Sequence, residues 1–161
     1  MLTKLEQTKQ ALAGKHKAID DWLDARQALL VGYMQLAGLT PARTKQRSLP
    51  KKTEELHQFC DRLVDYVSAG HFEIYHHVVT AFEQASGETL ELAKRIYPHI
   101  RNSTEFALEF NDKYSDADEA QLLLLDDDLN ELGPVLEERF KQEDRLVKAL
   151  HVVESLSTQQ A

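Results

Sequence analysis

The 161-residue chain is 42% hydrophobic and 29% charged, which indicates a globular protein large enough to fold as one domain, 1–161. Its formal charge of −8 disfavours nucleic acid and membrane surfaces as partners, and no apolar run approaches the roughly 20 residues of a membrane span. The first residues lack the apolar core of an export signal, and the single cysteine, Cys60, excludes an internal disulfide. We therefore expect a reduced, cytoplasmic setting.

Helical periodicity runs through almost the whole chain, and no stretch alternates as a half-buried strand does. A short helix is predicted over 3–13 and a longer one over 16–37, which Gly38 ends. The next segment, 38–49, is a basic loop whose positive charge extends to residue 52. It is either a contact arm for an acidic surface or an ordinary connection, and the sequence favours the connection.

Three further long helices follow. They are predicted over 50–86, over 89–111 with a bend at Pro98, and over 118–155 with a kink at Gly133–Pro134. Long amphipathic helices joined by short links are typical of an all-α fold, here an antiparallel four-helix bundle with the short N-terminal helix laid across it.

Negative charge gathers in the C-terminal part of the chain. From Asp112 to Asp144 there are twelve acidic residues and three basic ones, whereas the remainder holds fifteen acids and sixteen bases. Such a face attracts a basic partner, or it only keeps the protein soluble. Composition does not separate these two interpretations.

A polar residue interrupts the apolar face of each long helix when the residues are placed at 100° intervals. Arg26 falls between Leu23 and Leu30, and Glu143 falls between Phe140 and Val147. Because an unpaired buried charge is strongly destabilising, we predict a charge-balanced network through the bundle interior. The alternative is that these side chains reach outward at the edges of the bundle. The predicted members are Arg26, Asp65, Ser68, His71, Tyr75, Thr104, Arg139 and Glu143.

Catalysis is disfavoured, although Asp65, Ser68 and His71 lie three residues apart on one predicted helix. A hydrolytic triad needs the imidazole between the acid and the hydroxyl, whereas here Ser68 is in the middle. A metal site is disfavoured too, because His57, which has metal-like spacing to Asp61, lies off the predicted core stripe and the other histidines are scattered along the chain. We predict no catalytic residue, no metal ligand and no cofactor.

Three segments of the chain carry recognisable motifs. Residues 19–27 are Ile-Asp-Asp-Trp-Leu-Asp-Ala-Arg-Gln, residues 63–75 are Leu-Val-Asp-Tyr-Val-Ser-Ala-Gly-His-Phe-Glu-Ile-Tyr, and residues 136–146 are Leu-Glu-Glu-Arg-Phe-Lys-Gln-Glu-Asp-Arg-Leu. Together they resemble the Rsd/AlgQ family of sigma-factor regulators. The first is similar to the family pattern Asp-Arg-Trp-Leu-x-x-Arg, with Asp21 in place of the first Arg, the second matches the most recognisable block of the family almost completely, and the third is similar to its Arg-Phe-x-x-Glu-Asp-x-Leu motif. The resemblance covers nearly the whole chain and is weakest over 41–52.

The resemblance implies an anti-sigma factor that performs no chemistry. Family members bind the C-terminal domain of the primary sigma factor, region 4, which reads the −35 promoter element and contacts core RNA polymerase. Binding favours alternative sigma factors, typically as growth slows towards stationary phase. An acidic helical protein also suits a basic helix-turn-helix domain.

The resemblance also directs attention to particular residues. The three segments contain most of the predicted network, which we expect to fix the bundle behind the sigma-binding surface and to couple that surface to a second site. Asp20, Asp21, Trp22 and Tyr66 are the candidate outward-facing contacts. We expect no direct DNA binding and no membrane contact. A second protein partner is compatible with the sequence. The alternative function is a helical sensor that binds a small molecule or a metal in its polar core.

Overall fold

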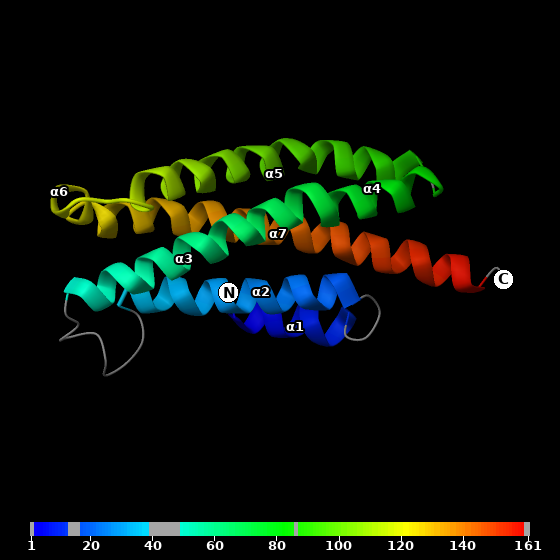
Figure 1. Ribbon diagram of the computed structural model, residues 1–161. Coiled ribbons are helices and arrows are strands. Elements are labelled where there is room, and N and C mark those ends of the chain that lie inside the picture. Colours follow the sequence, from blue (N-terminus) through cyan, green and yellow to red (C-terminus); the bar gives the residue numbers. More distant parts are fainter. Residues whose placement is uncertain (1, 13–16, 39–48, 86, 160–161) are drawn as a thin grey trace.

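The computed structural model describes residues 2–12, 17–38, 49–85 and 87–159, and all of their regular secondary structure is helical (Figure 1). The all-α prediction is therefore confirmed. The elements in chain order are α1 (Leu2–Leu12), α2 (Lys17–Leu36), α3 (Leu49–Ala69), the π-helical segment η2 (Gly70–Ile74), α4 (Tyr75–Glu83), α5 (Gly87–Tyr114), α6 (Glu119–Leu122) and α7 (Leu125–Gln159). None of the described helices combines the length and the apolar character that a membrane span requires.

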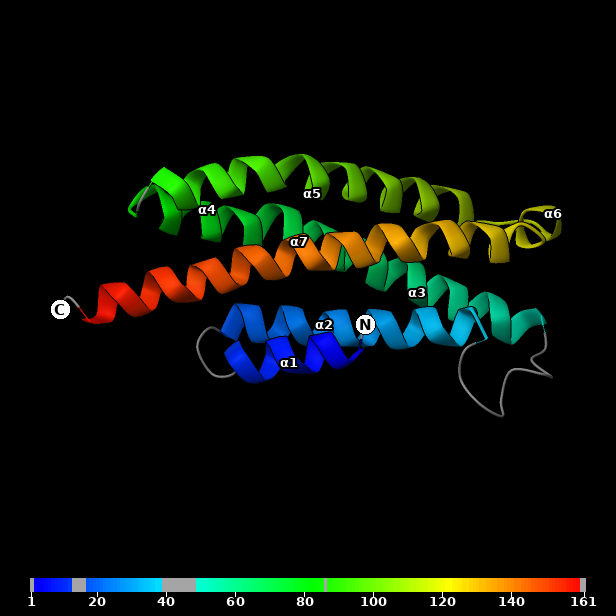
Figure 2. The ribbon, with the colours of Figure 1, turned by 180° about the vertical axis from the view of Figure 1, so that it is seen from behind.

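The long helices α2, α5 and α7 and the continuous stretch from α3 through α4 run lengthwise through the molecule, with α3 inclined to α2 (Figures 1 and 2). The most extensive packing is between α5 and α7, between α2 and α3, and between α3 and α5, while α4 also packs on α7. The short α1 lies on the outside, against α2 and α7. Apolar side chains from all of these units join in one buried cluster, which includes Leu23, Leu63, Ile100, Leu136 and Val147.

Two of the predicted helices are interrupted in the structure. The helix predicted over 118–155 is divided, because Asp118 caps the single turn of α6 through a capping box with Gln121 and the chain turns again before α7. Beyond that turn, α7 continues to Gln159 and includes Pro134. The helix predicted over 50–86 contains the π-helical segment η2. The predicted basic loop lies almost wholly outside the described residues.

Gly133 allows two helices to approach closely beside Pro134. A Cβ at position 133 would collide with the hydroxyl of Tyr33 on α2. That hydroxyl donates a hydrogen bond of 2.8 Å to the carbonyl oxygen of Leu129 on α7. The glycine therefore provides the space in which Tyr33 ties α2 to α7 one turn before the proline.

Candidate functional site

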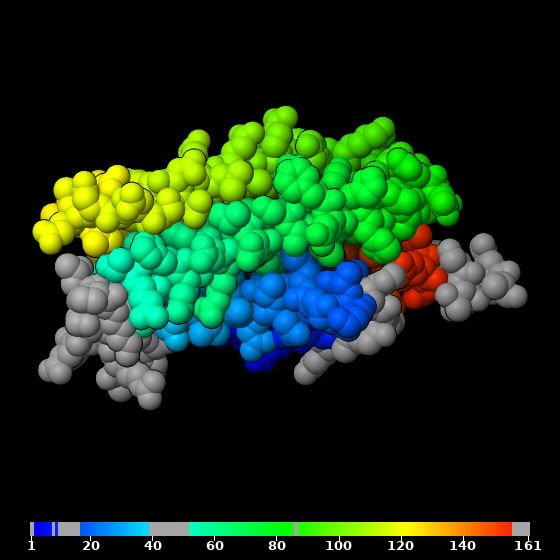
Figure 3. Space-filling view, viewed as in Figure 1, coloured from blue at the N-terminus to red at the C-terminus, as the bar shows by residue number. Residues whose placement is uncertain are grey.

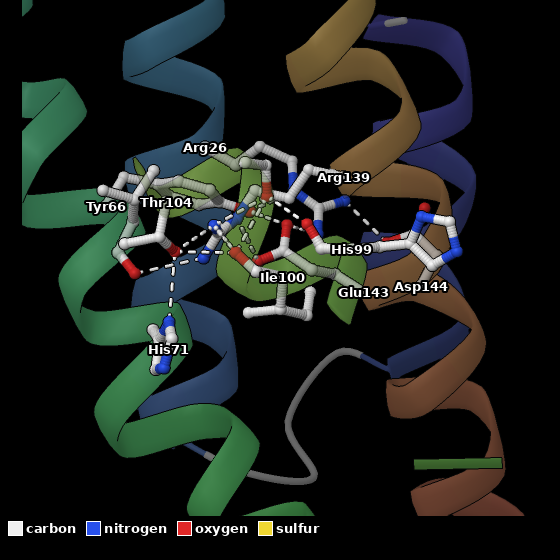
Figure 4. Close-up of polar contacts among 11 residues, drawn as sticks. Arg26, Tyr66, His71, His99, Ile100, Thr104, Arg139, Glu143 and Asp144 are labelled. Carbon is white, nitrogen blue, oxygen red and sulfur yellow. Dashed lines mark hydrogen bonds and ion pairs between the residues drawn. The ribbon is translucent and has the colours of Figure 1, made fainter. Parts of the chain in front are cut away.

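Two buried arginines organise the interior at the middle of the molecule, and the first is Arg26 of α2 (Figure 4). Its Nη1 donates to Asp144 Oδ1 at 2.6 Å, its Nη2 lies 3.5 Å from Glu143 Oε1, and its Nε donates to the Tyr66 hydroxyl at 2.9 Å. Tyr66 in turn donates to Glu143 Oε1 at 2.7 Å. Arg26 is only 1% exposed, so these partners replace the water that its charge has lost.

Arg139 of α7 is the second arginine, and it links three helices. Its Nε donates to Glu143 Oε2 at 3.2 Å, while its Nη2 donates to the carbonyl oxygen of Val67 on α3 at 3.0 Å. Its Nη1 faces α5, where it donates to Thr104 Oγ1 at 2.7 Å and to Ser103 Oγ at 3.1 Å. With Arg26, Glu143 and Asp144 it forms a set of two positive and two negative charges, so the interior is electrically balanced.

The surroundings of Arg26 favour its charged form. Burial alone would lower the pKa of the guanidinium, but Tyr66 and the carboxylates of Glu143 and Asp144 outweigh burial and raise it. The guanidinium also lies 4.9 Å from the ring centroids of Trp22 and Phe140, where the aromatic faces attract a cation. Burial raises the pKa of Tyr66 well above its ordinary value, so this hydroxyl keeps the proton it donates to Glu143.

His71, in η2, extends the network towards the surface. Its Nδ1 lies 3.2 Å from Thr104 Oγ1, which already accepts from Arg139, and its Nε2 lies 3.5 Å from the Tyr97 hydroxyl. Burial, together with the positive charge of Arg139, lowers the pKa of His71. The imidazole is consequently held neutral at pH 7.

Gly70 begins the π-helical segment at a point where the backbone packs against the buried charges. A Cβ at this position would stand 2.9 Å from Glu143 Oε2, 3.0 Å from Arg139 Nη2 and 3.2 Å from Trp22 Nε1. The backbone of α3 and η2 therefore runs directly against the buried charges, which leaves no room for a side chain. Insertions of one π turn in a helix are frequent at functional sites.

A groove lies between α2 and α3, on the face that Figure 3 shows, with a volume of about 490 Å³. Trp22 and Tyr66 line it, and their rings stack 5.4 Å apart, only 4° from parallel. Small alanines from both helices line it as well, and its charged lining consists of Asp21, Asp65, Glu73 and Arg62. The groove is therefore apolar within and mainly acidic at its edge.

The structure brings together five of the eight predicted network members: Arg26, Arg139, Glu143 and Thr104 are linked by direct hydrogen bonds, and His71 joins through Thr104. Asp65 is not a member. It is exposed on α3 at the groove, because its side chain points away from the stripe of Leu63 and Val67. Ser68 is half-buried without a described bond to these residues, and Tyr75 donates instead to the carbonyl oxygen of Ala93 at 3.1 Å.

Two of the candidate outward-facing contacts do not face outward. Trp22 is 4% exposed and Tyr66 is 1% exposed, whereas Asp20 is half-buried and Asp21 is exposed. The prediction that Trp22 and Tyr66 face outward was wrong, because it assumed that only one narrow apolar stripe of each helix is buried. Helices α2 and α3 are covered by neighbours over a wider arc, and Trp22 and Tyr66 lie inside that arc. Both still line the groove.

Sequence reasoning missed Asp144, Ser103 and the inward role of Tyr66. Asp144 follows Glu143 directly in the chain, so the pair presents two carboxylates to Arg26 from one turn of α7. That adjacency is the signal that would have identified it. Within the described part of the chain, no group of three or more His, Cys, Asp or Glu residues is arranged to hold a metal ion.

A family model described as regulator of RNA polymerase sigma(70) subunit, Rsd/AlgQ, matches residues 1–151. A protein named regulator of sigma D from Yersinia pseudotuberculosis (serotype O:1b) is 37% identical over 156 residues, which cover 92% of this chain and 88% of that protein. Proteins of the same name from Yersinia enterocolitica and Salmonella paratyphi B are each 36% identical, over 92% and 91% of this chain and 89% and 90% of their own lengths. The chain belongs to the Rsd/AlgQ family.

Proposed function

We propose that this protein is an anti-sigma factor that binds the C-terminal domain, region 4, of the primary sigma factor in the cytoplasm. By occupying that domain it blocks the contacts with the −35 promoter element and with core RNA polymerase, and so favours alternative sigma factors. In this proposal the chain acts as one domain, an antiparallel four-helix bundle with α1 on its outside. It acts by stoichiometric binding, without catalysis.

The groove between α2 and α3 is the single observation that carries the proposal furthest. Its edge carries the exposed carboxylates of Asp21, Asp65 and Glu73, against one base, Arg62. Its interior offers alanines and the stacked pair Trp22 and Tyr66. Small residues allow close approach of a helix, and the carboxylates suit basic side chains.

A helix-turn-helix domain fits such a groove. Its recognition helix presents basic side chains to DNA phosphates, so the same side chains are available to an acidic protein surface. A partner helix laid between α2 and α3 would place its basic face against the three carboxylates. Asp21 and Asp65 are the proposed contacts at the edge, and Trp22 and Tyr66 form the wall behind them. Asp20, half-buried one residue before Asp21, is an additional proposed contact.

The buried network supports the proposal by holding this wall in place. Tyr66 is hydrogen-bonded to Arg26 and Glu143, so the ring that lines the groove has a fixed position. Arg139 joins α3, α5 and α7 immediately behind it. A rigid binding surface loses less conformational entropy when its partner docks.

The test is an isothermal titration calorimetry experiment in which the full chain is titrated with the isolated C-terminal domain of the primary sigma factor. A 1:1 complex with a dissociation constant of about 1 μM or below in low salt is the expected result. Failure to form a complex in roughly that concentration range contradicts the proposal. If charge steers the encounter, the association rate should also fall as salt is added.

A further inference from the structure

A second and larger cleft lies between α1, α2 and α7, with a volume of about 710 Å³. It shares no lining residue with the groove between α2 and α3. Leu5 of α1, Leu30 of α2 and Phe140 of α7 give it an apolar lining. Its volume lies within the range of about 300–1,000 Å³ that is typical of small-molecule sites.

Three basic side chains of α7 border this cleft: Lys141, Arg145 and Lys148. Their spacing of four and three residues places them on one face of the helix. All three are exposed, and none takes part in an ion pair among the described residues; Arg145 donates only to the amide oxygen of Gln142, at 2.9 Å. Like charges at this spacing repel one another, so an anion bound between them would relieve the repulsion.

The acidic side chains of the cleft are Glu137, Glu138 and Asp144. Asp144 is engaged by Arg26 at 2.6 Å, and Glu138 accepts a hydrogen bond of 2.6 Å from the Gln142 amide. Glu137 and Glu138 precede the three bases by about one turn, so the cleft has an acidic end and a basic end. Two further bases line the cleft: Lys4 of α1, and Arg26 of α2, which is paired with Asp144.

We propose that this cleft binds a small anionic amphiphile, a molecule with a phosphate or carboxylate head and an apolar body. The head group lies among Lys141, Arg145 and Lys148, and the apolar body lies along Leu5, Leu30 and Phe140. This use of the cleft is independent of the sigma-binding proposal, because it involves neither α3 nor the groove beside it.

Three probes separate the contributions of head and body: octyl phosphate, octanol and inorganic phosphate, each titrated into the full chain by calorimetry below any micelle concentration. We expect octyl phosphate to bind at one site, about tenfold or more tighter than either of the other two. Inorganic phosphate binding as tightly as octyl phosphate would reduce the site to a simple anion patch and overturn the proposal. Octanol binding as tightly would reduce it to an apolar cleft and overturn it equally.

Two variants with the same change of charge locate the site. In K141Q/R145Q/K148Q, octyl phosphate should bind about tenfold or more weakly. In K94Q/R95Q/R101Q, three exposed bases of α5 are neutralised instead, and binding should stay unchanged. Thermal unfolding midpoints close to that of the parent chain would show that both variants are folded. Equal weakening in the two variants would mean that only overall charge matters and would contradict the assignment.

Discussion

Gly70 and Glu143 lie in direct contact: a Cβ at position 70 would stand 2.9 Å from Glu143 Oε2. The absence of a side chain at Gly70 therefore leaves space for the buried carboxylate of Glu143. The two residues pack together in the fold, although 73 positions separate them in the sequence.

Replacing Gly70 with alanine should destabilise the protein by about 1–3 kcal/mol, because the methyl group would displace the Glu143 carboxylate or the Arg139 guanidinium. Helical preference alone favours alanine over glycine by roughly 1 kcal/mol, so the direction of the change is diagnostic. Urea unfolding measures it. Gly87→Ala is the matched control, since a Cβ there would meet nothing within 4 Å. A G70A variant as stable as G87A would contradict the packing described.

Arg26→Ala and Glu143→Ala should each destabilise the protein by about 3–5 kcal/mol, because each removes one charge from a buried network and leaves the remaining charges unbalanced. The two effects should not add in the double variant, since the residues share one network. A double-mutant cycle by chemical unfolding measures this coupling. If each single variant lowers the free energy of unfolding by less than about 1 kcal/mol and the two effects add, the network has no energetic role.

Asp144 and Asp65 should behave differently, although both belong to the family-like segments. Asp144→Asn removes the carboxylate that pairs with Arg26 at 2.6 Å and should destabilise the protein by about 1–3 kcal/mol. Asp65→Asn changes an exposed side chain and should alter the free energy of unfolding by less than about 0.5 kcal/mol. A larger loss of stability for Asp65→Asn than for Asp144→Asn would instead place Asp65 in the buried network, as the sequence predicts, and would contradict the structure.

His71 should make stability depend on pH in mildly acidic solution. Its pKa in the folded protein is lowered below 6.5, so the unfolded chain binds a proton there more readily than the folded one. The free energy of unfolding should therefore fall as the pH drops through about 6.5. Unfolding at about pH 7.5 and about pH 5.5 measures this fall. His71→Gln should reduce the slope, whereas His76→Gln, at an exposed position of α4, should retain it.

The sequence was sufficient to predict the all-α fold and the polar positions Arg26, Arg139 and Glu143, because helical phase shows which side chains face the core. The sequence did not correctly predict which residues pair with these buried charges. The charge of Asp65 predicts a member of the network, yet the arc of α3 that neighbours cover includes Tyr66 and excludes Asp65. The width of that arc depends on how many helices surround α3, and periodicity within one helix does not contain this information. The cleft beneath α1 could not be predicted either, because it is formed by three separate helices.

Binding of two triple variants to the C-terminal domain of the primary sigma factor tests whether the groove between α2 and α3 is the binding site. D21N/D65N/E73Q removes the carboxylates at the edge of the groove, whereas E105Q/E109Q/E131Q removes the same charge from exposed acids of α5 and α7. We predict that the first variant binds the domain about tenfold or more weakly than the parent chain and that the second binds nearly as the parent does. Equal affinities of the two variants would contradict the claim that the groove between α2 and α3 is the binding site.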